Sequence, residues 1–367
     1  MPIRSALFLS VILVFLGIAQ AAETVTRERV VPASPYQAFA ALTVEWQMRQ
    51  WNEGVGVTSD VRPGGAWRLS YSDGRMDEGL YEITDRGTLL RFSWIRDEKA
   101  TTAEITFAAE GKDTRITIRH DVPGTDRAAR RLRQSVESWW DNRLSRLESY
   151  LTDYPGGYLA RPDRQGPQPA VLVLHDGFGM SRNARAFCDS LAARGYVALA
   201  VDMFRGEVTS DLTEAARFMA LVKEEDALDA VNRGLAHLRT RKDVNPARIA
   251  VWGLGYGGTA ALRLATTDPR LKGCVAWHPS SAPPEELLPR ISAPVLLVFG
   301  DSNVQNPHPE ITAIVGSLTQ AGVRVENSIQ LAGRRFSDPG YGVDFSGTAT
   351  AAAWRITLQF LDRQLRL

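Results

Sequence analysis

The chain has 367 residues, a length that favours two domains, and its 43 basic and 42 acidic residues leave a net charge of +1. This balance excludes the broad basic surface of a nucleic-acid-binding protein, and the apolar content of 44% is ordinary for a globular protein. Cys188 falls in a predicted helix and Cys274 in a predicted buried strand. We therefore expect two free, buried thiols and no disulfide.

The N-terminus has the pattern of a secretory signal peptide. Arg4 precedes an apolar run over residues 6–18, and Ala19-Gln20-Ala21 offers the small residues of a signal-peptidase site. We expect cleavage after Ala21, which removes residues 1–21; an uncleaved anchor is the alternative, and the run is short for one. Export predicts a periplasmic or secreted protein that has no membrane attachment after cleavage.

Residues 23–153 alternate β-prone runs with turn signals and end in one long amphipathic helix. Ser34 is expected to cap a first helix, and His120 stands alone at a strand end, which favours a structural role over a catalytic one. Strands are predicted at residues 25–31, 66–71, 78–84, 89–94, 103–108 and 115–120, and helices at 35–42 and 126–151. The apolar face of the long helix holds Val136, Trp140, Leu144, Leu147 and Leu151.

Several stretches of this segment carry a family resemblance. They are the run Val31-Pro32-Ala33-Ser34-Pro35-Tyr36-Gln37-Ala38-Phe39, the turn Arg62-Pro63-Gly64-Gly65, the strands Leu90-Arg91-Phe92-Ser93-Trp94 and Thr114-Arg115-Ile116-Thr117, and Trp139-Trp140. The segment resembles the START-like (SRPBCC) superfamily, in the branch related to the activator of the heat-shock chaperone ATPase. The resemblance implies an α+β helix-grip domain with a cavity between sheet and helix, where some relatives bind apolar ligands. A ligand-binding module and a purely structural appendage both stay open.

Residues 155–367 alternate short apolar runs with helical patterns. Strands are predicted at residues 170–175, 196–201, 249–252, 273–277, 294–299 and 323–331, and helices at 182–194, 212–223, 225–240 and 349–365. The strands lack polar alternation, as expected of strands buried on both faces. Alternating units of this kind predict a parallel-type sheet with helices on both faces.

A glycine cluster follows the run at residues 249–252 and precedes a helix-compatible stretch. Strand, sharp turn and helix form the context in which a G-x-S-x-G pattern presents a nucleophile. In the frame Gly253-Leu254-Gly255-Tyr256-Gly257, the central position holds Gly255, which has no reactive side chain. The pattern therefore predicts the scaffold of a hydrolase and not its nucleophile.

Further landmarks identify the family that this segment resembles. They are Gly157-Tyr158-Leu159-Ala160, Leu174-His175-Asp176-Gly177-Phe178-Gly179, Gly195-Tyr196-Val197-Ala198, Val201-Asp202-Met203-Phe204, and Pro294-Val295-Leu296 leading to Gly300-Asp301. The segment resembles the dienelactone hydrolase family, which implies an α/β hydrolase fold and hydrolysis of esters or lactones by a Cys-Asp-His triad. Carried over by motif, the triad positions hold Gly255, Asn303 and Arg334. None of these can serve as nucleophile, charged acid or neutral base, so the resemblance implies a pseudoenzyme.

A small-molecule site above the glycine turn is the main functional hypothesis. Backbone N–H groups near Gly177 and Tyr256, with Arg334 and Arg335, would favour a carboxylate-bearing ligand. The candidate binding residues are Asp176, Gly177, Gly255, Tyr256, His278, Asn303 and Arg334.

Two other hypotheses are weighed beside that one. The protein is an active ester or lactone hydrolase that uses His278 with Ser280 or Ser281, or its second domain only supports a ligand-carrying first domain. The five histidines and two cysteines show no metal-ligand spacing, and the formal G-x-G-x-x-G match at residues 253–258 lacks an acidic partner for a ribose, so no metal or cofactor is predicted.

Overall fold

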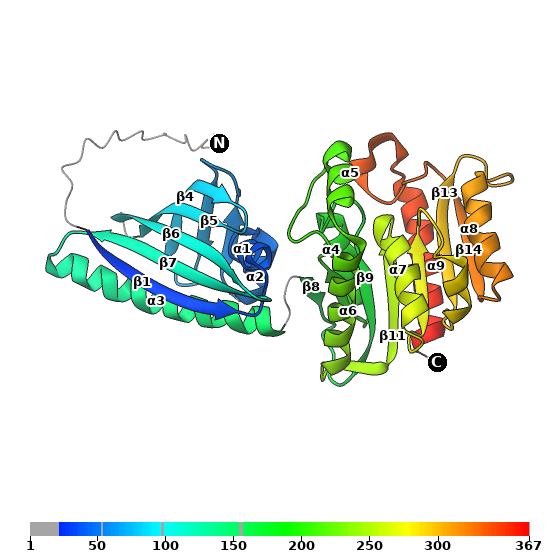
Figure 1. The fold of residues 1–367 in the computed structure, drawn as a ribbon, viewed down its shortest axis with the longest axis horizontal. Coiled ribbons are helices and arrows are strands. Elements are labelled where there is room, and N and C mark those ends of the chain that lie inside the picture. Colours follow the sequence, from blue (N-terminus) through cyan, green and yellow to red (C-terminus); the bar gives the residue numbers. More distant parts are fainter. Residues whose placement is uncertain (1–21, 53, 97–98, 154–156, 367) are drawn as a thin grey trace, which may run out of the picture.

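The computed structural model describes residues 22–52, 54–96, 99–153 and 157–366. Over these ranges the chain forms two sheets, each with its own helices (Figure 1). The predicted signal peptide, residues 1–21, lies outside the described residues.

The first sheet is antiparallel, with seven strands in the order β1-β7-β6-β5-β4-β3-β2. The strands are β1 (Ala22–Val31), β2 (Gly56–Ser59), β3 (Ala66–Ser70), β4 (Met76–Asp85), β5 (Leu89–Arg96), β6 (Lys99–Glu110) and β7 (Asp113–Pro123). The long helix α3 (Arg127–Asp153) runs along the sheet, and α1 (Pro35–Thr43) and α2 (Glu45–Trp51) lie at the end nearer the second sheet (Figure 1). The predicted α+β helix-grip domain is confirmed.

Local sequence explains most of these elements. Ser34 and Gln37 form a reciprocal capping box at the start of α1, with Pro35 in the first turn. Along the central parts of β6 and β7 alternate side chains are buried in the core of this domain, which also buries the predicted apolar face of α3. The short α2 and β2 were not predicted, because seven and four residues give too little periodicity to detect.

The second sheet has the order β14-β13-β12-β11-β9-β10-β8, and all its pairs are parallel except β10 with β8. The strands are β8 (Gly157–Ala160), β9 (Gln168–Leu174), β10 (Val197–Val201), β11 (Val244–Leu254), β12 (Gly273–Trp277), β13 (Val295–Asp301) and β14 (Val325–Leu331). The predicted parallel-type sheet is present, and the unpredicted β8 adds an antiparallel edge.

Helices cover both faces of this sheet, as an apolar parallel sheet requires. One face packs against α4 (Arg182–Ala193) and α9 (Gly347–Leu365). The other packs against α5 (Leu212–Leu221), α6 (Glu224–Thr240), α7 (Tyr256–Thr267) and α8 (Pro309–Gln320). Two short 3₁₀ helices, η1 (Glu285–Arg290) and η2 (Pro339–Asp344), complete the fold. Cys188 and Cys274 are free and buried, as expected.

The two domains meet where α2 lies beside β8 (Figure 1). Trp46 of α2 is buried within the core cluster of the second domain, in edge contact with Tyr158 at 5.9 Å. The guanidinium of Arg185 lies 5.5 Å from the centre of the Trp46 ring, and Arg86 forms an ion pair with Glu207 across the junction. One aromatic side chain therefore joins the first domain to the core of the second.

Candidate functional site

A pocket of about 460 Å³ lies at the carboxyl ends of β9, β11, β12 and β13. Ligand sites of open α/β sheets form at this edge. Apolar side chains of α5 and α8 form one wall, and the loops that follow the strands supply the polar groups. Of the seven predicted binding residues, six line the pocket: Asp176, Gly177, Gly255, Tyr256, His278 and Arg334.

Gly255 occupies the sharp turn between β11 and α7. Its φ of 53° and ψ of −113° lie in a region that side-chain-bearing residues rarely adopt. Its N–H donates to the carbonyl of Trp277 at 2.8 Å, and a Cβ built on Gly255 would lie 3.3 Å from Cβ of Asp176. The turn thus has the strained geometry of a nucleophile elbow and carries only a hydrogen.

The glycines that follow allow α7 to begin directly above the sheet. A Cβ on Gly257 would lie 2.2 Å from the carbonyl oxygen of Leu174 and 2.5 Å from that of His175. Only glycine therefore fits at this crossing. The first turn of α7 has no side-chain cap, so its N–H groups are available to an anion at the helix N-terminus.

His278 follows β12 with a φ of 50°, one of two non-glycine residues with positive φ among the described residues. Its ring lies edge-on to Phe336 at 4.7 Å. Both ring nitrogens are buried without a hydrogen-bond partner among the residues that the structure describes. Burial, and then the charges of Arg335 and Arg334, lower the pKa of His278 to about 3. A neutral imidazole with an unpaired donor and acceptor therefore lies at the pocket wall.

The structure does not assemble the relocated serine–histidine pair. Ser280 Oγ lies 3.1 Å from Thr259 Oγ1, and the Ser280 N–H donates to the same oxygen at 3.0 Å. Ser280 and Ser281 are exposed, and neither forms a hydrogen bond with His278. The hydroxyl and the imidazole needed for nucleophilic catalysis are thus not coupled here.

Asp176 is a buried carboxyl group at the pocket floor, next to Gly255. Its Oδ1 accepts a hydrogen bond from the Phe178 N–H at 2.9 Å, and its carboxyl is also hydrogen-bonded to the Tyr341 hydroxyl. Burial is the main cause that raises the pKa of Asp176 to about 7, and repulsion from Asp338 adds to it. Near neutral pH this carboxyl is therefore partly protonated.

The two arginines of the pocket differ in their pairing. Arg334 forms an ion pair with Glu310, which offsets its charge. Arg335 stacks over the Tyr341 ring at 5.4 Å and has no carboxylate within 4 Å among the described residues. Both arginines were predicted to add positive charge, and Arg335 is the one whose charge is not compensated.

Asn303, at the predicted acid position, is not among the residues that line the pocket. It is exposed, and its side-chain oxygen accepts from the Asn306 N–H at 3.0 Å. Asp301 accepts from the N–H groups of Asn303 and His308, each at 2.8 Å, and these bonds lower its pKa. Both polar side chains thus stabilise the loop before α8 and do not orient a base.

A small cavity lies between the sheet and α3 of the first domain. Its volume is about 30 Å³, comparable with one water molecule. Aromatic side chains fill the surrounding space, and the buried Arg143 guanidinium lies between the rings of Trp51 and Trp139 at 4.9 and 4.6 Å. His120 bonds Thr101 and Trp140 in this core, consistent with a structural role. This cavity, as lined by the described residues, is far smaller than a lipid.

Within the ranges that the structure describes, no helix is long and apolar enough to cross a membrane. No group of three or more histidine, cysteine, aspartate or glutamate side chains in those ranges is arranged to hold a metal ion.

The sheet order, the covering helices and the turn at Gly255 define an α/β hydrolase fold. The chain belongs to the dienelactone hydrolase family, whose model matches residues 156–365. Residues 32–152 match a second family, Activator of Hsp90 ATPase homolog 1-like protein. The predicted fusion of a START-like domain with a dienelactone hydrolase domain is confirmed.

Relatives match the second domain. A protein of Yersinia pestis named "Putative carboxymethylenebutenolidase" is 28% identical over 46% of this chain and 68% of its own length. A protein of Escherichia coli K12 with the same name is 23% identical over 56% of this chain and 81% of its own. The solved structure m3DLH is similar with a TM-score of 0.51 and 27% identity, over 57% of this chain and 92% of that one.

Many of the other lining residues were not predicted, and Met219 and Tyr341 are two examples. They enter the pocket from α5 and η2, which lie far from the landmark motifs in sequence. A single methionine or tyrosine on such a segment gives no signal of its own. Only the packing of these segments over the strand ends reveals them.

Proposed function

We propose that this chain is an exported dienelactone hydrolase family protein whose second domain binds a small carboxylate-bearing molecule with an apolar body and does not hydrolyse it. The observation that carries the proposal is Gly255: the elbow geometry and the pocket are present, and the nucleophile is absent. The other hydroxyls and the imidazole of the described pocket form no nucleophile–base pair.

The polar side of the pocket suits a carboxylate. The uncapped start of α7 offers N–H groups, and Arg335 offers an uncompensated positive charge. His278 can donate one further hydrogen bond from a ring nitrogen that has no partner in the described part of the chain. When protonated, Asp176 can donate another, which makes it compatible with an anion.

The opposite wall suits an apolar body of small size. Leu212, Ala215 and Met219 of α5 line this wall together with Ile311 and Ile314 of α8. A volume of about 460 Å³ lies within the usual range of small-molecule sites. The relatives' name specifies a lactone with a carboxymethylene group, which combines these two features, so carboxymethylenebutenolide is the first probe.

The test combines calorimetry with a hydrolysis assay on the full chain. We expect carboxymethylenebutenolide to bind, and its ultraviolet absorbance to stay constant during incubation. Arg335→Gln should weaken binding by roughly 10- to 150-fold, since an ionic hydrogen bond contributes about 1.5–3 kcal/mol. Arg355→Gln, at an exposed position on α9, is the matched control and should bind as the wild type does.

Rapid consumption of the lactone that is abolished by His278→Phe or Asp176→Asn would instead identify an active hydrolase. Export is tested separately, by N-terminal sequencing of protein recovered outside the cytoplasm. A mature chain that begins at Ala22 is expected. A chain that retains residues 1–21 would contradict cleavage, without bearing on the pocket.

A further inference from the structure

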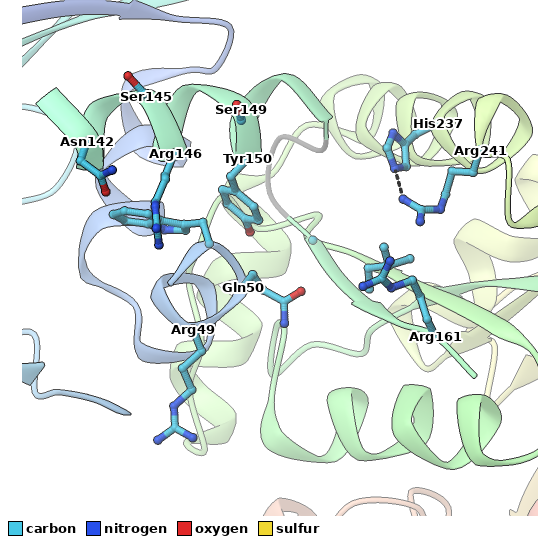
Figure 2. A pocket seen from close by; sticks show the side chains of 13 residues that line it. Arg49, Gln50, Asn142, Ser145, Arg146, Ser149, Tyr150, Arg161, His237 and Arg241 are labelled. Carbon is cyan, nitrogen blue, oxygen red and sulfur yellow. Dashed lines mark hydrogen bonds between the residues drawn. The ribbon is translucent and has the colours of Figure 1, made fainter. Parts of the chain in front are cut away.

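The second domain borders other cavities besides the pocket at the strand ends, which we call the hydrolase pocket. A cleft of about 990 Å³ lies between the domains and shares no lining residue with that pocket. Figure 2 shows Arg146 and Arg161 at opposite ends of this cleft, so its charged groups do not converge on one ligand. A cavity of about 420 Å³, here called the side cavity, is different because it adjoins the hydrolase pocket. Its walls come from α5, α6, α7 and the loop that follows β12.

The side cavity and the hydrolase pocket have part of their walls in common. Met219, Tyr256 and Ser280 line both of them. A side chain that borders two cavities separates them only by its own thickness. A ligand that extends past one of these side chains therefore reaches from the hydrolase pocket into the side cavity.

The two large side chains at this boundary differ in how firmly they are held. The ring of Tyr256 lies 5.4 Å from that of Phe204, which is buried in the core of the domain. Met219 is 37% exposed, and it reaches the loop after β9, where a Cβ built on Gly177 would lie 3.0 Å from its sulfur. A methionine side chain is unbranched and flexible. Met219 can therefore turn aside while Tyr256 stays in place, and this movement opens a passage between the cavities.

Apolar groups make up much of the lining of the side cavity. Those that line it and not the hydrolase pocket are Val222, Ala227, Leu228, Ala260, Ala282 and Pro284. Such a surface favours the methylene groups of a ligand, because each one that it buries is removed from water.

The charged groups of the side cavity pair with each other. Its described lining has two charged residues, Glu224 and Arg263, and they form an ion pair in which Nε lies 3.0 Å from Oε1. At the boundary, Ser280 Oγ is hydrogen-bonded to Thr259 Oγ1 at 3.1 Å. The side cavity therefore suits an uncharged chain better than a second charged group, whereas Arg335 of the hydrolase pocket suits a carboxylate.

We propose that the hydrolase pocket and the side cavity together bind a linear monocarboxylate of the fatty-acid type, whose chain passes between Met219 and Tyr256 into the side cavity. This inference rests on the proposed function, because the carboxylate end lies in the hydrolase pocket beside Arg335 and the start of α7. It adds the chemical class of the ligand, an acid with a long uncharged chain.

Titration calorimetry of the full chain with linear monocarboxylates from hexanoate to dodecanoate tests the proposal. We expect the affinity to rise with chain length, by roughly fourfold for each methylene group that becomes fully buried. Dodecanedioate has the same length as dodecanoate and a second carboxylate. It should bind at least roughly tenfold more weakly, because the side cavity would have to bury a charge without a free partner.

Ala282→Phe separates the contributions of the two cavities. Ala282 lines the side cavity and not the hydrolase pocket, so a phenylalanine ring there should fill the space meant for the chain. The affinity for dodecanoate should fall at least roughly tenfold, and the affinity for the compact carboxymethylenebutenolide should stay that of the wild type. Ala351→Phe, the same change at an exposed position on α9, is the matched control and should alter neither affinity.

A photolabel locates the chain directly. Dodecanoate with a diazirine at the end of its chain, irradiated on the full chain, should label side-cavity residues such as Leu228 or Ala282, which peptide mass spectrometry identifies. Label found only on other elements, such as α8, would overturn the proposal, and so would wild-type affinity for dodecanoate in Ala282→Phe. If carboxymethylenebutenolide binds and a longer chain brings no gain, this inference alone fails; if neither ligand binds, the proposed function fails as well.

Discussion

Alanine in place of Gly255 should destabilise the second domain specifically. Gly255 has φ 53° and ψ −113°, a conformation that costs a residue with a Cβ about 1–3 kcal/mol. The added methyl group would also lie 3.3 Å from Cβ of Asp176, a contact closer than usual. We therefore expect a loss of about 1–3 kcal/mol in the free energy of opening of this domain.

The two cysteines provide a probe for that domain alone. Cys188 and Cys274 are the only cysteines of the chain, and both are buried in the second domain. When closing is fast, the rate at which a thiol reagent labels them reports the population of the open form. A loss of about 1–3 kcal/mol should speed labelling by roughly 5- to 150-fold.

Gly316→Ala is the matched control. Gly316 lies within α8, and a Cβ built there meets no atom within 4 Å. Alanine should stabilise this helix by about 0.4–1 kcal/mol and slow labelling by roughly two- to fivefold. If Gly255→Ala also labelled more slowly than the wild type, the turn would not be strained, and the reasoning about the elbow would be wrong.

Three further predictions concern the pocket and the domain junction. Asp176 has a pKa of about 7, so its carboxyl group loses its proton between pH 6 and pH 8. The affinity of the pocket for a carboxylate should therefore fall roughly tenfold over this range. Calorimetry of Asp176→Asn should show no such dependence on pH. Gly255→Cys with Arg334→His should produce weak activity toward an activated ester, and adding Asn303→Asp should raise it by less than about threefold, because Asn303 lies outside the pocket lining; a large gain would show that the acid position does reach the site. Trp46→Ala should cost about 3–5 kcal/mol and separate the calorimetric unfolding of the two domains, since this side chain joins their cores; one unchanged transition would contradict that role.

Two features of the fold could be predicted from local sequence alone. The apolar stripe of α3 and the unbroken apolar runs of β9 to β13 specify their own burial, because side-chain periodicity reflects which faces contact the core. The turn at Gly255 could also be located from sequence, because the close backbone contacts around it leave room only for a cluster of glycines. Short elements such as α2 and β8 could not be predicted, because so few residues do not show a periodic pattern of apolar side chains.

The candidate site was predictable where a motif marks a strand end and not elsewhere. Gly255 and His278 directly follow parallel strands, and Asp176 lies two residues after another, so they share one edge of the sheet. Asn303 also follows a strand, yet its side chain bonds its own loop, and no pattern in the sequence distinguishes that outcome.

The loss of the nucleophile is thus a property of the amino-acid sequence, because the identity of one residue in a recognisable turn decides it. The pairing of charges is a property of the folded chain. Arg334 is offset by Glu310, whereas Arg335 has no carboxylate within 4 Å among the described residues. Electrostatic interactions depend on distances between residues far apart in the chain, and only tertiary packing sets those distances.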